Sequence, residues 1–234
     1  MDWNFKSGVI IIGSLLWQDY LEIEGDNIRL HWRNSHLEIN NKIPVKLPIR
    51  YGRKSSSNII SMVFSNRMQN KKGFGYVVPF KNKINNLDEL LCETVALSTA
   101  EGLKGKFVAK WGVLTYMFND LIINEKKKEI VKFFKKRKNS DFDITEYKTG
   151  RERSCITKSL KLDIGWIEPI VSKNKNELDR FHFLLAIATK PVNPIPSLKE
   201  IAESIKADNK RKYFLNNLIN GIITYDDFEI SKFL

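Results

Sequence analysis

The chain has 234 residues and a mass of 27.2 kDa, enough for one large domain or two small ones. Its 42% hydrophobic and 28% charged residues are typical of a folded globular protein, and its two cysteines are too few for a disulfide framework or a multi-cysteine zinc module. The formal net charge of +12 is the unusual feature, because a strongly basic balance suggests a polyanionic partner.

The positive charge is uneven, both in residue type and along the chain. There are 29 lysines but only 10 arginines, and Lys, Ile and Asn make up a third of the sequence, a bias typical of an AT-rich genome. Selection for phosphate binding favours arginine, whose planar guanidinium binds phosphate through two hydrogen bonds. Residues 126–138 alone carry a net charge of +7. Two interpretations stay open: genome bias with a solvated face, or an anion site on this segment.

The first part of the chain is predicted to be rich in strands. Five segments are apolar and β-branched, or alternate between apolar and polar residues, and we predict them as strands: residues 9–12, 28–32, 36–39, 59–65 and 74–80. The last two flank a turn that ends at Gly73 and suits a hairpin. Pro44 and Pro48 bracket an extended segment that we do not expect in the middle of a sheet.

After these strands, the spacing of the apolar residues changes to that of a helix. Over residues 87–100 apolar side chains recur every three or four residues, which predicts a helix. Asn86 is its predicted N-cap, and Gly102 stands just past its end. Residues 107–118 predict another strand, and residues 124–138 a basic helix.

The C-terminal part mixes both types of element. Strict alternation over residues 159–170 predicts a strand, and residues 177–188 suit either a helix or a strand. Ser197 followed by Glu200 is a capping box that begins a helix. Two more helices are predicted, over residues 209–218 and close to Asp227.

We therefore expect an α/β (α+β) protein with a small mixed β-barrel or sheet and flanking helices. Residues 1–138 form the first domain, which ends in the basic helix, and the polar residues 139–153 mark the boundary. Residues 154–234 form a C-terminal strand-and-helix subdomain packed on the first domain.

A short motif, Gly-Ser-Leu-Leu-Trp, follows the first predicted strand. A Gly-Ser turn that leaves a buried strand presents backbone N–H groups and one hydroxyl, which suits a carboxylate or another small anion. The motif resembles the substrate loop of the gamma-glutamylcyclotransferase-like superfamily, whose pattern is Tyr-Gly-Ser-Leu, and of its ChaC-like branch, with Tyr-Gly-Ser-Leu-x-Trp. Four residues match the pattern and are candidates for substrate binding: Gly13, Ser14, Leu15 and Trp17. Ile12 stands where the family has tyrosine.

The order of the following elements is also similar to that family, over about residues 8–118. In the family a hairpin strand precedes a Leu-rich helix, which delivers one catalytic glutamate before the next strand. The resemblance implies that Glu101, in the Glu-Gly pair after the helix, is this glutamate, and Glu93 inside the helix is the alternative. It does not interpret residues 120–234.

The chemistry that the resemblance implies is an intramolecular aminolysis. The free α-amine of a γ-glutamyl group attacks its own γ-carbonyl, which releases an amine or peptide and leaves 5-oxoproline. The glutamate takes the amine proton and returns it to the leaving nitrogen, and a carboxyl does this best when burial raises its pKa. The chain is then either such a γ-glutamyl cyclising enzyme or an inactive relative that binds a small γ-glutamyl-type or other carboxylate ligand, without a cofactor.

Two groups of basic residues remain. Arg50 and Arg53 lie in a polar stretch that either helps to hold an anionic substrate or is a solvated hairpin loop. In the basic helix, apolar residues at helical spacing predict a buried face, and the polyanion candidates are Lys132, Lys135, Lys136, Arg137 and Lys138. The alternative function is thus a non-enzymatic module that binds nucleic acid or an acidic protein, although no nucleic-acid-binding motif is present.

Other signals are weak. His31 and His36 have no third metal ligand nearby, so we expect no metal site. The apolar run over residues 9–17 lacks a small-residue cleavage site and is too short to cross a bilayer. We expect a cytoplasmic protein without a membrane partner, and the oligomeric state stays open.

Overall fold

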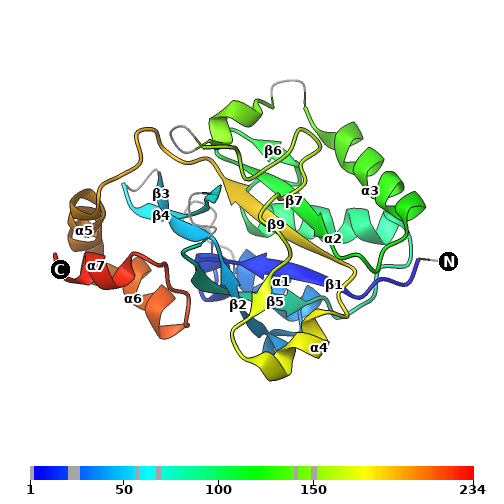
Figure 1. Ribbon diagram of the computed structural model, residues 1–234, viewed down its shortest axis with the longest axis horizontal. Coiled ribbons are helices and arrows are strands. Elements are labelled where there is room, and N and C mark those ends of the chain that lie inside the picture. Colours follow the sequence, from blue (N-terminus) through cyan, green and yellow to red (C-terminus); the bar gives the residue numbers. More distant parts are fainter. Residues whose placement is uncertain (1–2, 21–26, 56–57, 67–69, 140–141, 149–151) are drawn as a thin grey trace.

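A seven-stranded mixed sheet runs through the molecule in the computed structural model, which describes residues 3–20, 27–55, 58–66, 70–139, 142–148 and 152–234 (Figure 1). The strand order is β6-β7-β9-β1-β5-β2-β8. The strands are β1 (Ser7–Ile11), β2 (Ile43–Leu47), β5 (Gly73–Pro79), β6 (Val108–Ala109), β7 (Gly112–Phe118), β8 (Glu168–Pro169) and β9 (Phe183–Thr189). The expected α/β class is confirmed, and within the described residues the sheet is open and not a closed barrel.

The centre of the sheet combines strands from both ends of the chain. All five residues of β1 are buried, and β1 pairs antiparallel with β5 and parallel with β9. Gly8 is required there, because a Cβ at this position would lie 2.4 Å from the Val78 carbonyl oxygen. Since β9 lies between β7 and β1, the expected division into residues 1–138 and 154–234 is revised: strands of both parts share one sheet.

The strand predictions before the first long helix need three corrections. Residues 28–32 and 36–39 lie in and around helix α1 (Ile28–His36), whose buried residues follow helical spacing. β4 (Ile60–Phe64) pairs with β3 (Ile49–Lys54) in a two-stranded sheet and not with β5, so the predicted hairpin is wrong. Pro44 stands in β2, which pairs with β5 and β8, and its carbonyl accepts a bond from the Ile170 N–H at 3.0 Å.

Helix α2 (Leu87–Ala100) matches its prediction at both ends. The Asn86 side chain caps it by accepting from the N–H groups of Asp88 and Glu89, and Gly102 follows the last turn with φ of +82°. Arg29 at the start of α1 bonds to Ala100 at the end of α2, and His36 at the end of α1 pairs with Glu93 inside α2, so the two helices run antiparallel and side by side.

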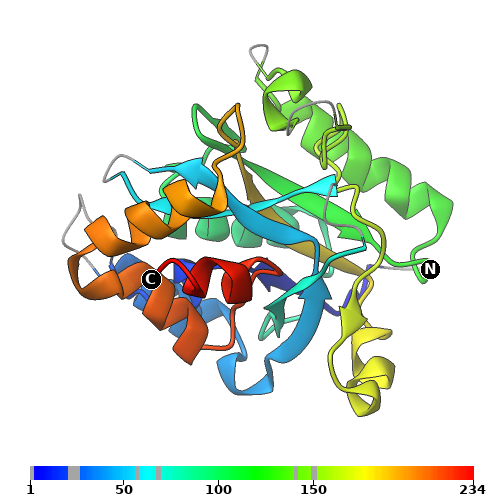
Figure 2. The ribbon, with the colours of Figure 1, turned by 60° about the vertical axis from the view of Figure 1, so that its left-hand side comes forward.

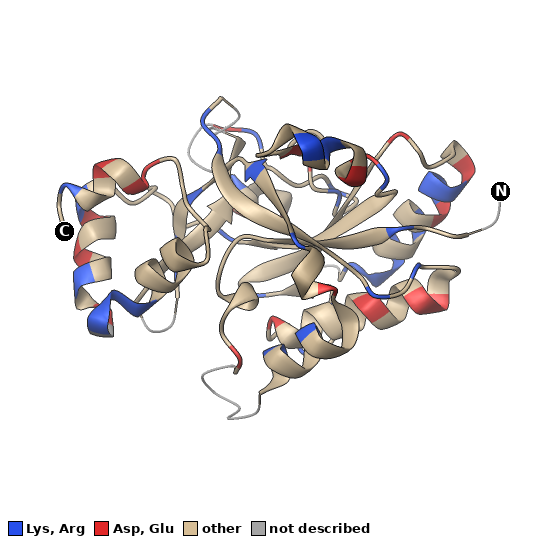
Figure 3. Ribbon diagram, turned by 90° about the horizontal axis from the view of Figure 1, so that it is seen from below, with Lys and Arg blue, Asp and Glu red and all other residues tan. Residues whose placement is uncertain are grey.

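The basic segment is helical as predicted. Helix α3 (Asn124–Arg137) packs on the sheet through Ile130, Phe133 and Phe134, and the ring of Phe134 lies 4.3 Å from that of Tyr116 in β7. No described helix is long and apolar enough to cross a bilayer. Lysines and arginines also occur at both ends of the molecule and not only on α3 (Figure 3).

The C-terminal segments mostly follow the predicted pattern. The predicted strand over residues 159–170 is wrong except at β8, because Leu160 and Gly165 have φ of +67° and +74°, which interrupt an extended chain. α4 (Lys175–Leu178) precedes β9, and the capping box begins α5 (Leu198–Ala207). α5, α6 (Lys212–Ile219) and α7 (Asp227–Ser231) gather beside β3 and β4 at one end of the molecule (Figure 2).

Candidate functional site

The Gly-Ser turn leaves β1 and enters a short 3-10 helix, η1 (Ser14–Leu16). A Cβ at Gly13 would lie only 3.0 Å from the hydroxyl of Tyr213 in α6, so glycine lets this helix approach the turn. In the described part of the chain, the N–H groups of Ser14 and Leu15 have no hydrogen-bond acceptor. The turn therefore holds two backbone donors that are unpaired within the described residues.

Arg29 connects this turn to the end of α2. Its guanidinium is buried, and its Nη1 donates to Ser14 Oγ at 3.0 Å and to Gln18 Oε1 at 2.6 Å. Its Nε donates to the Ala100 carbonyl at 3.1 Å, and its Nη2 pairs with Glu101 Oε2 at 3.0 Å. The Arg29 side chain thus contacts both the Gly-Ser turn and the end of α2, which lie far apart in the sequence.

Glu101, and not Glu93, lies beside the Gly-Ser turn. Glu101 is the C-cap of α2 and its side chain is 20% exposed. Glu93 lies about 12 Å earlier along the helix and pairs with His36 Nδ1 at 2.9 Å. Burial raises the pKa of Glu93, and the interaction with His36 partly opposes this rise. A raised pKa is what a carboxyl needs to act as a general base. Geometry comes before pKa in such a choice, and it favours Glu101.

Arg53 and Tyr213 complete the surroundings of Glu101. Burial lowers the pKa of Arg53, and the negative charge of Glu101 opposes this shift, so the two side chains interact electrostatically. The Arg53 guanidinium stacks on the Trp111 ring at 4.6 Å. Burial also raises the pKa of Tyr213, with Glu101 and Arg53 among the charges that act on it. We call Ser14, Arg29, Arg53, Glu101 and Tyr213 the Arg29 cluster.

The other predicted substrate residues have structural contacts. Leu15 is buried, and its carbonyl accepts from Arg33 Nη1 at 2.9 Å. Trp17 Nε1 donates to Asn217 Oδ1 at 2.8 Å, which ties the turn to α6. Arg50 is buried in β3. Gly13, Ser14 and Arg53 therefore lie at the Arg29 cluster or against it. The Leu15 N–H belongs to the same turn, and the Trp17 ring lies 6.2 Å from the ring of Tyr213.

Sequence reasoning missed Arg29 and Tyr213. Arg29 stands in a segment whose alternation imitates a strand, and the one available signal was its spacing of four from Arg33, which places two arginines on one helix face. Tyr213 lies 200 residues from Gly13, and no pattern in the sequence connects them. Arg29 and Tyr213 both reach the site through contacts between elements that lie far apart in the sequence.

The predicted polyanion residues of α3 divide into two groups. Lys132, Lys135 and Lys136 are exposed, and no carboxylate within the described residues pairs with them. Arg137 instead lies over the Phe133 ring at 3.8 Å, and Lys138 Nζ donates to the Lys158 carbonyl at 3.3 Å. The exposed lysines line a groove of about 810 Å³.

Comparison with protein-family models, with curated proteins and with solved structures found no match. No group of three His, Cys, Asp or Glu side chains that could hold a metal ion occurs in the described part of the chain. The candidate functions therefore rest on the contacts of this chain alone.

Proposed function

We propose that the Arg29 cluster is the site of a γ-glutamyl cyclising enzyme that releases 5-oxoproline. The observation that carries the proposal is the pair of bonds from Arg29 to Ser14 and to Glu101. The Gly-Ser turn and the candidate base come from opposite ends of the resembling region, and a substrate that spans them would meet both an anion-binding turn and a carboxylate.

Glu101 is the group that would move the proton in this proposal. Arg29 binds Oε2 of Glu101, while Oε1 has no partner in the described part of the chain and the side chain is partly exposed. Oε1 would take the proton from the α-amine as nitrogen attacks the γ-carbonyl, and would deliver it to the leaving nitrogen as that bond breaks. The reacting atoms belong to one molecule, so orientation supplies much of the acceleration.

The remaining groups suit the charges of such a substrate. The N–H groups of Ser14 and Leu15, which have no acceptor among the described residues, would hold the oxyanion that develops on the γ-carbonyl oxygen. Arg53, whose charge interacts with that of Glu101, would bind the α-carboxylate. An inactive relative would use the same contacts to bind the ligand without turnover.

The test is 5-oxoproline release from γ-glutamyl peptides, measured by mass spectrometry. Glu101→Gln keeps the shape of the side chain and removes the base, so we expect the rate to fall by a factor of about 10² or more. Glu93→Gln is the matched control and should retain most of the rate. Undiminished release by Glu101→Gln contradicts the assignment, and γ-glutamyl binding without release by the unsubstituted protein indicates the inactive relative.

A second candidate function rests on α3. Its exposed lysines without acidic partners follow one face of the helix, and they would bind the phosphates of a nucleic acid with a strong dependence on salt. Replacing Lys132, Lys135 and Lys136 together by Gln should make the protein elute from a heparin column at lower salt. The matched control replaces three exposed lysines elsewhere by Gln: Lys173, Lys199 and Lys206. Equal shifts for the two triple variants mean that only net charge is measured.

A further inference from the structure

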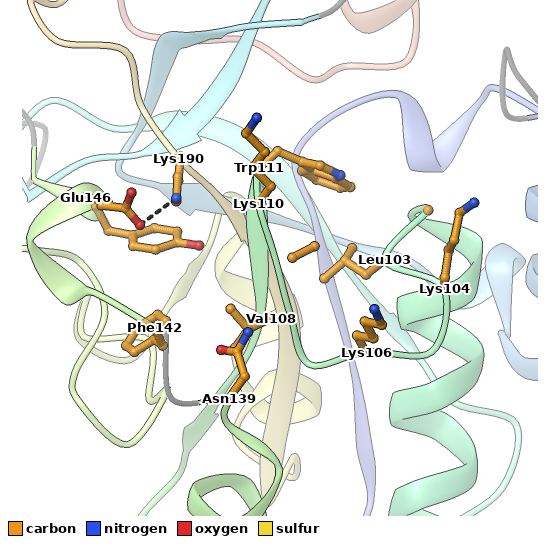
Figure 4. Close-up of a pocket in the computed structure, with 13 residues that line it drawn as sticks. Leu103, Lys104, Lys106, Val108, Lys110, Trp111, Asn139, Phe142, Glu146 and Lys190 are labelled. Atoms are coloured by element: carbon orange, nitrogen blue, oxygen red, sulfur yellow. Dashed lines mark ion pairs between the residues drawn. The ribbon is translucent and has the colours of Figure 1, made fainter.

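A separate cavity of about 580 Å³ lies beyond the end of α2. Its walls come from residues 102–111, from the segment around η4 (Ile144–Tyr147), and from Lys190 after β9 (Figure 4). Neither Ser14 nor Glu101 lines it. The volume is within the usual range of about 300–1,000 Å³ for small-molecule sites.

The charges around this cavity are mainly positive. Four lysines line it: Lys104, Lys106, Lys110 and Lys190. Glu146 is the only carboxylate among the lining residues, and it pairs with Lys190 at 2.5 Å. Lys106 and Lys110 have no carboxylate partner within the described residues. An anion in the cavity would therefore meet lysines whose charge no acidic side chain neutralises.

Aromatic side chains also line the cavity. Trp111, Phe142 and Tyr147 all line the cavity. The Arg53 guanidinium stacks on the Trp111 ring at 4.6 Å, and the Trp111 backbone carbonyl accepts from the Lys190 N–H at 2.9 Å. These rings provide flat apolar surface beside the lysines, which suits an aromatic group that carries a negative charge.

Tyr147 supplies an independent sign of a missing partner. Only 2% of the residue is exposed, and its hydroxyl is buried without a hydrogen-bond partner among the described residues. Buried hydroxyls are normally bonded, and the residue that carries this unpaired one lines the cavity, so a ligand acceptor that reaches the hydroxyl would complete its bonding. Burial also raises the pKa of Tyr147, which keeps the hydroxyl protonated as a donor.

We infer that this cavity binds a small organic anion with an aromatic ring, of the size of a mononucleotide. The ring would lie against Phe142, the anionic group would meet Lys110, and an acceptor atom would accept a hydrogen bond from the Tyr147 hydroxyl; Trp111 and Lys106 lie on the other side of the hairpin from Phe142 (Figure 4). No member of the Arg29 cluster lines this cavity, although Arg53 stacks on its Trp111, and the inference does not depend on γ-glutamyl chemistry.

Isothermal titration calorimetry with AMP, adenosine and inorganic phosphate tests this inference. AMP carries both features and should bind at least about tenfold more tightly than adenosine or phosphate, which each carry one. Lys110→Gln should weaken AMP binding by about tenfold, since a hydrogen bond to a charged group is lost. Lys206→Gln, an exposed lysine of α5, is the matched control and should leave the affinity unchanged.

Tyr147→Phe separates ligand binding from folding. The phenyl ring keeps the packing and removes the unpaired hydroxyl, so the variant should unfold at the same or a higher temperature while AMP binds about fivefold more weakly. Absence of AMP binding overturns the inference. Binding that Lys110→Gln and Tyr147→Phe both leave unchanged overturns it as well.

Discussion

Arg29 should contribute strongly to stability, because its guanidinium connects three parts of the chain. In Arg29→Met the Ala100 carbonyl, in a residue that is fully buried, loses a donor, and Glu101 loses its ion-pair partner. Breaking a buried ion pair costs about 3–5 kcal/mol. Since Glu101 is 20% exposed and can turn toward water, we expect the lower end, about 3 kcal/mol.

Urea denaturation measures this loss. Arg180→Met removes an exposed arginine without an ion pair among the described residues, and should change the free energy of unfolding by less than about 0.5 kcal/mol. The cycle of Arg29→Met, Glu101→Gln and the double variant should give a coupling energy of about 1–2 kcal/mol. A loss below about 1 kcal/mol for Arg29→Met, or additive effects in the cycle, would refute the role of Arg29 as the connecting residue.

Two further predictions concern the C-terminal helices. Burial raises the pKa of Asp227 to about 6, although Thr224 donates to it. Because the folded pKa exceeds the ordinary value of 3.8, protonation stabilises the fold at low pH, and this contribution is lost as pH rises through 6. Asp227→Asn should therefore gain about 2–3 kcal/mol over the unsubstituted protein between pH 4 and pH 7.5 in chemical denaturation, and a constant difference would contradict this. Ser197→Ala removes the cap of α5, where Ser197 Oγ accepts from the Glu200 N–H, and should lower the unfolding midpoint by a few degrees; an unchanged midpoint would show that the cap is dispensable.

Local signals in the sequence predicted the elements that frame the candidate site. Four β-branched residues ending at Gly13 identify β1 and its turn, and the period of the leucines with Asn86 identifies α2 to the residue. Glu101 follows α2 directly, so the position of the candidate base could be predicted along with the helix. These features depend on neighbours in the chain.

The parts that failed depend on tertiary contacts. α1 buries Arg29 and Arg33 together with Trp32, so its inner face is not apolar and its sequence imitates a strand. The hydrogen-bond partners of these arginines lie in other elements, and no hydropathy pattern contains them. Similarly, the sequence around β9 suits either a strand or a helix. Only the position of β9 between β7 and β1 in the structure shows that it completes the central sheet.

In the proposed reaction, Glu101, oriented by Arg29, cyclises a γ-glutamyl group. The most direct measurement follows γ-glutamyl-alanine by proton NMR in the presence of the unsubstituted protein and of Glu101→Gln. We expect 5-oxoproline and alanine to appear in equal amounts with the unsubstituted protein, and at least about a hundredfold more slowly with the variant. Equal rates for the two proteins, or an unchanged spectrum with both, would contradict it.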